Sequence, residues 1–128
     1  MILIAVALVF IALPAGGMVL RTLQNTYGNL YMPTVAFLKQ NSGANDIVMG
    51  GADLAFGLGF DSNLVADGCF GYYTGKRPKF IVYDSAGETS WQDSKTFSPE
   101  FYEYFPRLLN EEYRLAFENA GYKVYERK

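Results

Sequence analysis

The sequence predicts an α/β fold, in which one amino-terminal transmembrane helix precedes a small three-layer, Rossmann-like domain with a mostly parallel sheet of about four strands. Three observations support this prediction. The first twenty residues form a dense apolar block. Segments 46–50 and 79–84 have continuously apolar centres, which is typical of strands buried on both faces of a parallel sheet. Glycine-rich turns and helical segments separate the strands, as in right-handed strand–helix–strand units. We therefore expect a transmembrane helix over residues 1–22 and one α/β domain over residues 23–128.

Residues 2–20 contain no charged side chain. Nineteen helical residues at about 1.5 Å each span roughly 28 Å, close to the hydrocarbon thickness of a bilayer. Arg21 ends the run and is suited to snorkelling to the headgroups. The alternatives are a buried soluble helix and a cleaved signal peptide, but a signal peptide predicts basic residues before the apolar run, and none precedes it here. We expect membrane localisation, with a single span in this chain.

The chain from the span to residue 84 predicts one helix and three strands. Residues 30–40 form a helix with Pro33 in its first turn, where a missing N–H does little harm. Residues 52–58 form one or two further helical turns, and residues 68–78, rich in glycine and turn formers, form an exposed loop. The predicted strands are 46–50, 64–66 and 79–84.

The last third of the chain predicts a loop, a long helix and a closing strand. Residues 85–96 form the loop, and Ser98-Pro99-Glu100 is a strong helix start, with a capping hydroxyl, a proline and an acid in the first turn. Pro106 should kink or restart this helix. Apolar residues then recur at helical spacing up to a stop at Gly121, and residues 122–127 form the strand. The stripe consists of Leu109, Tyr113, Ala116, Phe117 and Ala120.

Composition excludes several classes of function. There is no histidine, so Ser-His-Asp and Cys-His mechanisms cannot be assembled within this chain, and the commonest zinc ligand is missing. The single thiol, Cys69, cannot form a disulfide within the chain. With 11 basic and 13 acidic residues, the chain has no basic field for nucleic acid. We expect no catalytic residue, no metal site and no cofactor here.

Five side chains are candidates for contact with a ligand or a lipid headgroup. Asp67 and Asp84 stand at predicted strand ends, where ligands of parallel α/β sheets bind, although strand-end aspartates also cap turns and helices. Lys76 and Arg77, with Tyr72 nearby, are suited to holding an anionic group, although a solvated basic turn explains them as well. Gly50-Gly51 with Gly57 and Gly59 does not match the spacing of a dinucleotide fingerprint or a P-loop, which makes a nucleotide-binding domain a weak third hypothesis.

The segment ADLAFGLGFDSNLVADGCFGYYTGKRPKFIVYD, and in particular LVADGCFGYYTGKRP followed by KFIVYD, resembles a part of polytopic membrane glycosyltransferases of the GT-C class. These include bacterial proteins similar to dolichyl-phosphate-mannose–protein mannosyltransferases (family 39-like). In such proteins the last transmembrane helix leads into a small extracytoplasmic α/β domain at the carboxyl terminus. The resemblance covers the chain from the apolar span to the last strand.

The resemblance implies a function in sugar transfer from a polyprenyl-phosphate donor, with the domain on the periplasmic or extracellular side. The family's catalytic acids lie in an early loop that this chain does not contain, so no catalytic role transfers to any residue here. We therefore expect a fragment-like accessory domain of a glycosyltransferase, whose partners are the bilayer, the lipid-linked donor or the remaining transmembrane part of the enzyme. The alternative is a free-standing, membrane-anchored binding or interaction module.

Overall fold

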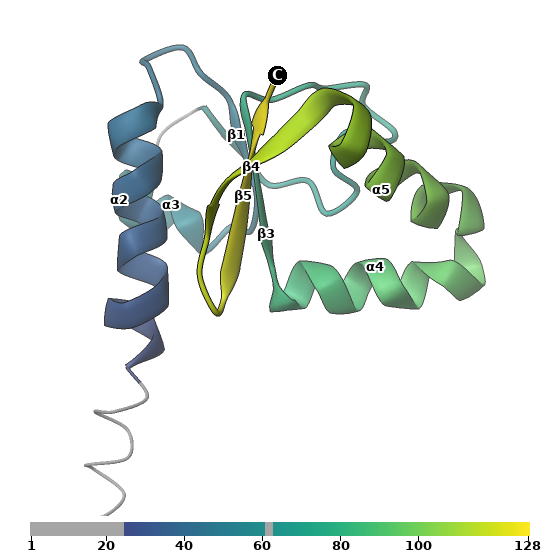
Figure 1. Ribbon diagram of the computed structural model, residues 1–128, viewed down its shortest axis with the longest axis horizontal. Helices are drawn as coiled ribbons and strands as arrows, with labels where there is room; N and C mark the ends of the chain where they lie inside the picture. The colour runs from purple at the N-terminus through teal and green to yellow at the C-terminus, as the bar shows by residue number, and fades with distance from the viewer. Residues whose placement is uncertain (1–24, 61–62) are drawn as a thin grey trace, which may run out of the picture.

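The computed structural model describes residues 25–60 and 63–128. Helices lie on both sides of one central sheet, with α2 and α3 on one side and α4 and α5 on the other (Figure 1). The elements in chain order are η1 (Tyr27–Tyr31), α2 (Met32–Asn41), β1 (Val48–Met49), α3 (Leu54–Leu58), β2 (Leu64–Val65), β3 (Phe80–Asp84), α4 (Ser85–Phe97), α5 (Pro99–Glu112), β4 (Tyr113–Glu118) and β5 (Tyr122–Arg127).

The sheet is mixed, with five strands in the order β2-β1-β3-β5-β4. Strand β1 pairs in parallel with β2 and β3, whereas β5 pairs antiparallel with both β3 and β4. The prediction of a mostly parallel sheet of about four strands is therefore wrong. The parallel pairings join only two residues each, whereas the two antiparallel pairings, β3 with β5 and β4 with β5, join five each.

The error arises from β4, which the apolar stripe from Leu109 to Ala120 predicts as helix. Helix α5 ends at Glu112, and the chain continues at once into the strand. Tyr113, Leu115 and Phe117 also alternate along the chain, so this segment satisfies the strand period as well as the helix period. Pairing with β5 decides between the two, because the hairpin joins the backbone groups on one side of β4, the edge strand, to those of β5.

The predicted loop over residues 85–96 is also wrong, since these residues form α4. The Asp84 carboxylate caps the helix by accepting a hydrogen bond of 2.8 Å from the Gly87 N–H. Helix α4 buries few residues and therefore has no apolar stripe in its sequence. Such a stripe is the pattern by which a helix is recognised from sequence. By contrast, the structure has the predicted helix start at Pro99 and the predicted strand at 122–127, although the Ser98 hydroxyl does not make the predicted capping hydrogen bond.

Helix α5 continues through Pro106 without restarting. Proline has no N–H, so the carbonyl of Tyr102, four residues earlier, loses its helical donor. The Trp91 indole N–H of α4 donates to this carbonyl at 3.0 Å, and the Trp91 ring stacks on the Tyr102 ring with centroids 4.7 Å apart. A side chain from the neighbouring helix therefore satisfies the group that proline leaves open, and α4 and α5 are joined at this point.

Strand β3 divides the core between the two faces of the sheet. Phe80 and Val82 point toward α2 and α3, in a cluster of mostly aliphatic residues. Ile81 and Tyr83 point to the opposite face, where aromatic residues of α5 pack. All four side chains are buried, which explains why this strand is continuously apolar in sequence.

The predicted transmembrane helix over residues 1–22 lies outside the described residues. Within residues 25–60 and 63–128, the helices are too short or too polar to cross a bilayer. The described chain begins at the amino-terminal end of η1, which continues directly into α2.

Candidate functional site

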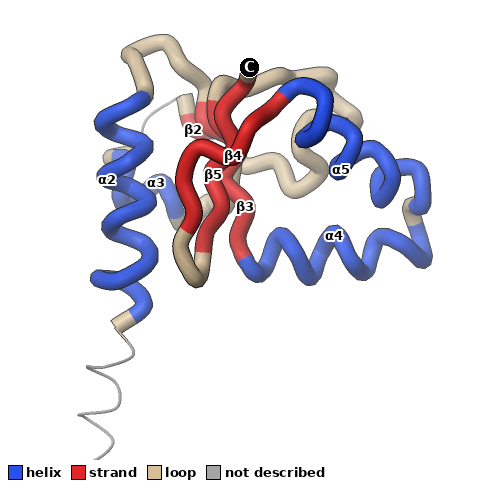
Figure 2. The backbone as a smooth tube through the Cα atoms, viewed as in Figure 1, coloured by secondary structure: helices blue, strands red, loops and turns tan. Residues whose placement is uncertain are grey.

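The carboxyl ends of the parallel strands form the part of the fold best suited to binding a ligand. After β1 the chain turns at Gly50-Gly51 toward α3 on one face of the sheet, and after β3 it enters α4 on the other face. Figure 2 shows the two helices leaving the strands on opposite sides. Ligands of open α/β sheets bind in the crevice between two such strands. In this fold the crevice lies between β1 and β3.

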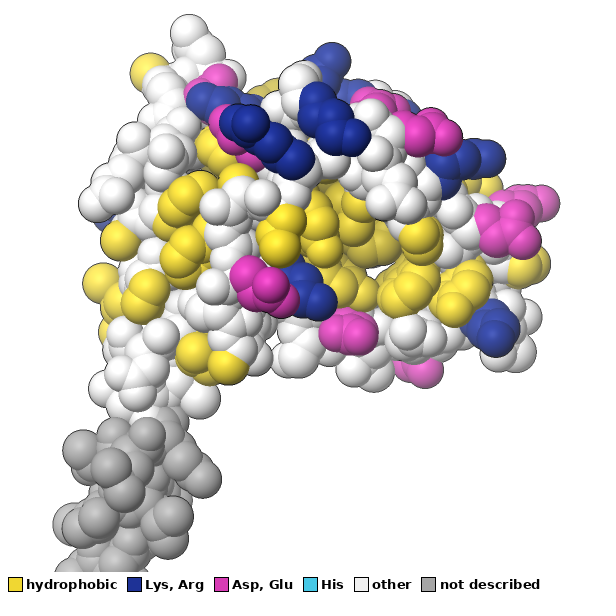
Figure 3. Space-filling model, in the orientation of Figure 1, with side chains coloured by type: hydrophobic (Ala, Val, Ile, Leu, Met, Phe, Trp, Pro, Cys, Tyr) yellow, Lys and Arg dark blue, Asp and Glu magenta, His cyan; other side chains and the backbone are white. Residues whose placement is uncertain are grey.

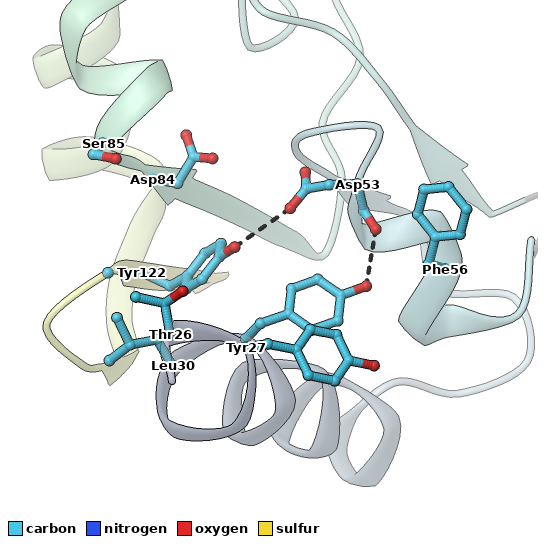
Figure 4. A pocket seen from close by; sticks show the side chains of 10 residues that line it. Thr26, Tyr27, Leu30, Asp53, Phe56, Asp84, Ser85 and Tyr122 are labelled. Atoms are coloured by element: carbon cyan, nitrogen blue, oxygen red, sulfur yellow. Dashed lines mark hydrogen bonds between the residues drawn. The ribbon is translucent and has the colours of Figure 1, made fainter. Parts of the chain in front are cut away.

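The first cavity, about 480 Å³ in volume, opens at this edge. It lies between the amino-terminal end of η1, the turn before α3, the start of α4 and the β4–β5 hairpin (Figure 4). Its wall combines aromatic rings with two carboxylates. The lining residues are Thr26, Tyr27, Leu30, Tyr31, Asp53, Phe56, Asp84, Ser85, Gly121 and Tyr122.

Hydrogen bonds from two tyrosines hold Asp53 in the wall of the first cavity. The Tyr31 hydroxyl donates to the Asp53 backbone carbonyl at 2.8 Å and accepts from the Gly57 N–H at 2.7 Å. The Tyr122 hydroxyl donates to Asp53 Oδ2 at 3.3 Å, and Figure 4 shows the two side chains pointing toward each other. Asp53 Oδ1 lies over Gly51, and none of these contacts uses it, so in an exposed residue it is available to accept a hydrogen bond.

Both tyrosines remain hydrogen-bond donors at neutral pH. Burial, followed by the nearby Asp53 carboxylate, raises the pKa of Tyr122 to about 12. Burial also raises the pKa of Tyr31, and the Asp53 charge acts in the same direction, against the Gly57 N–H, which lowers it. A neutral phenol beside a carboxylate is the arrangement that favours donation from hydroxyl to carboxylate.

A second cavity of about 380 Å³ adjoins the first and shares Asp53 and Asp84 with it. Its floor is the Gly50-Gly51 turn, and its far wall includes Asp67 and Ser90. The turn is packed tightly, because a methyl group on Gly50 would lie 2.7 Å from Leu54 Cδ1. Helix α3, which follows, has only five residues, so the glycines serve close packing and do not build a phosphate-binding helix terminus.

Asp67 and Asp84, predicted at strand ends, do lie together at the carboxyl edge. Asp84 lines both cavities while capping α4. Asp67 lines the second cavity and also orders the loop that follows β2, accepting from the N–H groups of Cys69 and Gly71 and from the Thr74 hydroxyl. Both aspartates thus have a structural role beside any contact with a ligand.

The other three predicted residues, Tyr72, Lys76 and Arg77, do not line either cavity. Arg77 lies just before β3, at the opposite end of that strand from Asp84, and its Nε donates to both Glu112 oxygens at 3.1 and 3.2 Å. Lys76 is exposed. Tyr72 packs on Tyr104, and its hydroxyl donates to Glu100 at 3.3 Å. The basic pair stays a prediction, separate from the carboxyl-edge site.

Sequence reasoning missed Asp53 and Tyr122 as site residues. Asp53 lies beyond the turn after the first strand, inside the predicted helical turns 52–58, so the strand-end argument did not reach it. Tyr122 offered no such signal. It reaches the cavity from the β4–β5 hairpin, which the sequence did not predict, and it meets Asp53 across 69 positions of sequence.

The chemistry of the first cavity suits an uncharged ligand with many hydroxyl groups. Two carboxylates accept hydrogen bonds and repel phosphate, while aromatic rings offer flat apolar faces to the C–H side of a sugar ring. Within the described residues there is no group of three or more potential metal ligands. The visible face in Figure 3 carries basic and acidic side chains intermixed, with no extended surface of one sign.

We compared the chain with known families, curated proteins and solved structures. No family model, no curated protein and no solved structure matches this chain.

Proposed function

We propose that this chain is an accessory domain of a polytopic membrane glycosyltransferase that uses a polyprenyl-phosphate-linked sugar, and that its first cavity holds a glycosyl group of the acceptor or donor. Catalysis resides in another part of that enzyme. The observation that carries the proposal is the pairing of Asp53 and Asp84 with aromatic rings at the carboxyl edge. The resemblance of the segment that contains both aspartates to GT-C proteins supplies the substrate class.

Each part of the cavity has a defined task in this proposal. The Asp53 carboxylate, held by Tyr122, accepts hydrogen bonds from sugar hydroxyls. Asp84 Oδ1 is used by the cap of α4, so Oδ2 is the oxygen left to accept a hydrogen bond from the ligand. Tyr27 and Phe56 provide the apolar faces. The phosphate of a donor would lie outside the cavity, away from the two carboxylates.

The proposal is tested by titrating the full 128-residue chain in detergent micelles with methyl mannoside and methyl glucoside. The readout is the NMR shift of the backbone amides of Gly51, Asp53, Ser85 and Gly121. Because a hydrogen bond to a charged group contributes about 1.5–3 kcal/mol, Asp53→Asn should weaken binding by roughly 10-fold or more. Asp93→Asn, on the exposed side of α4, is the matched control and should bind as the unmodified chain does.

Two outcomes contradict the proposal. Shifts of equal size with cyclohexylmethanol, which has the apolar ring but lacks the ring hydroxyls, would show that hydroxyl groups are not recognised. Equal binding by Asp53→Asn and Asp93→Asn would remove the carboxylate from the site.

The alternative, a free-standing anchored binding module, uses the same cavity without an enzyme attached. A tag placed after Lys128 in the native gene separates the two. A tagged product much larger than the 128-residue chain favours the glycosyltransferase, and a product of that size favours the module.

A further inference from the structure

Three exposed aromatic residues lie at the start of η1 and on α3 and its carboxyl end. They are Tyr27, Phe56 and Phe60, with exposed fractions of 62%, 76% and 71%, and we refer to them as the aromatic ridge. The rings of Phe56 and Phe60 touch edge to face with centroids 5.4 Å apart. Tyr27 and Phe56 line the same cavity, where Figure 4 shows both side chains, and Phe60 adjoins this pair through its contact with Phe56.

Neither core packing nor backbone preference accounts for phenylalanine at position 60. The side chain is mostly exposed, and the backbone is left-handed with φ of 56°, a region that phenylalanine rarely adopts. Helix α3 ends through two such residues, Gly59 and Phe60, whose N–H groups both donate to the Ala55 carbonyl. The ending presents an apolar ring outward at a cost in backbone strain. An apolar partner outside the domain explains the arrangement.

We propose that the aromatic ridge inserts into the headgroup region of a lipid bilayer. Tyr27 follows Arg21 by six residues, and Arg21 ends the uncharged run of residues 2–20, which has the length to cross a bilayer. Tyrosine and other aromatic residues concentrate at the level of the headgroups on either side of such a run. The amino-terminal end of η1, which carries Tyr27, is thus the end of the domain that faces the membrane.

The carboxyl edge of the sheet faces the same way. In Figure 1 the start of α2, the carboxyl end of β3 and the turn of the β4–β5 hairpin all lie at the lower end of the molecule, where the chain enters. The first cavity, with Tyr27 and Phe56 in its wall, therefore opens at the bilayer surface. This places the cavity within reach of a group carried by a lipid. The insertion of the ridge does not itself require that the cavity bind a sugar.

Tryptophan substitution with brominated lipid tests the inference directly. Phe56→Trp is made in the full chain, and Phe97→Trp, at the far end of α4 with an exposed fraction of 74%, is the matched control. Both sites are exposed, so both substitutions should fold. Each variant is reconstituted into phosphatidylcholine vesicles with or without bromine on the acyl carbons nearest the headgroup. The emission of Trp91, measured in the unmodified chain, is subtracted.

Bromine should quench about half of the added emission of Phe56→Trp, because an aromatic ring in the headgroup region lies beside the labelled carbons. The added emission of Phe97→Trp should be unchanged. Equal quenching of the two variants, or no quenching of either, overturns the inference, as does failure of the chain to associate with vesicles. Blue-shifted emission from Phe56→Trp without quenching also overturns it, since residues 2–20 or a second copy would then cover the ridge. Sugar binding is not part of this readout, so the two proposals fail separately.

Discussion

The two faces of the sheet are packed in different ways. The face covered by α2 and α3 is mostly aliphatic, and its backbones approach closely, since a methyl group on Gly57 would lie 2.5 Å from Val35 Cγ2. The face covered by α4 and α5 is mostly aromatic, and its rings stack, with the centroids of Phe70 and Phe105 4.3 Å apart. Strand β3 contributes to both faces through its alternating side chains.

The aliphatic and aromatic composition of the two faces reflects the chain segments that pack on each face. The aromatic face covers the long loop after β2 and a helix that contains a proline, and both leave backbone carbonyls without regular partners. Ring-bearing donors satisfy these carbonyls: Tyr113 bonds Pro78 at 2.8 Å, Tyr104 bonds Phe70 at 3.3 Å and Trp91 bonds Tyr102 at 3.0 Å. An aromatic residue with a polar end stabilises irregular backbone and fills the core at once. On the aliphatic face Tyr31 makes a bond of the same kind to the Asp53 carbonyl, and close contact holds α3 on α2.

The largest expected effect comes from deleting a ring on the aromatic face. Phe105 is 2% exposed and contacts the rings of Phe70, Tyr83 and Trp91. Phe105→Ala should lower the free energy of unfolding by about 3–5 kcal/mol, because it leaves a cavity among rings that cannot all move to fill it. Urea unfolding followed by circular dichroism measures the change. Phe105→Leu should cost much less, and equal costs for the two would show that the stack contributes no more than any apolar volume.

The aliphatic face should respond to the opposite change, the addition of a methyl group. Gly57→Ala would place Cβ 2.5 Å from Val35 Cγ2 and 2.8 Å from the Tyr31 hydroxyl oxygen. We expect a loss of about 1–3 kcal/mol in unfolding free energy despite the better helix propensity of alanine. Gly68→Ala is the control, because no described atom lies within 4 Å of the new methyl group. If the two variants are equally stable, close packing is not what holds α3 on α2.

A double-mutant cycle tests the partnership between Trp91 and Pro106. Trp91→Phe removes the donor to the Tyr102 carbonyl and should cost about 1–2 kcal/mol. Pro106→Ala restores an N–H that can donate to the same carbonyl, so Trp91→Phe should cost about 1 kcal/mol less in that background. Unfolding free energies of the four chains give the coupling. Strictly additive costs would mean that the indole bond does not compensate for the proline.

The smallest effect concerns pH. Burial, followed by the charge of Glu112, raises the pKa of Tyr113 from its ordinary value of 10.0 to about 12. The folded state favours the neutral phenol. The stability that the protein gains from this preference is fully present below pH 10 and is lost as the pH rises toward 12. Tyr113→Phe should lower the free energy of unfolding by about 1 kcal/mol at pH 7. Between pH 10 and pH 12 this variant should lose less stability than the unmodified chain.

Unfolding at neutral and alkaline pH checks this prediction, with Tyr73→Phe as the control, since Tyr73 is 74% exposed. The same alkaline loss in all three chains would assign it to tyrosines other than Tyr113.

Sequence reasoning found part of the candidate site. Asp84 was predicted because strand β3 is unmistakable and the carboxyl ends of parallel strands are where ligands bind. The partner of Asp53 in the cavity, Tyr122, starts the predicted closing strand, but it was missed because β4, which pairs with that strand in a hairpin, was predicted as helix. The basic pair at Lys76 and Arg77 was predicted from charge alone, and the structure ties Arg77 to Glu112. Local sequence patterns identify which residues have the chemistry for a site, but not which of these residues the fold brings into contact.

The sequence by itself determined the elements that depend on local rules. The buried strand β3 and the closing strand β5 follow from apolar runs, and the start of α5 follows from proline at its first position. Tertiary structure decided the form of residues 113–118, whose apolar positions satisfy both the helix and the strand period. The antiparallel pairing with β5 made them a strand, because only there do their backbone groups complete a ladder. That choice turned a mostly parallel sheet into a mixed one and brought Tyr122 to Asp53.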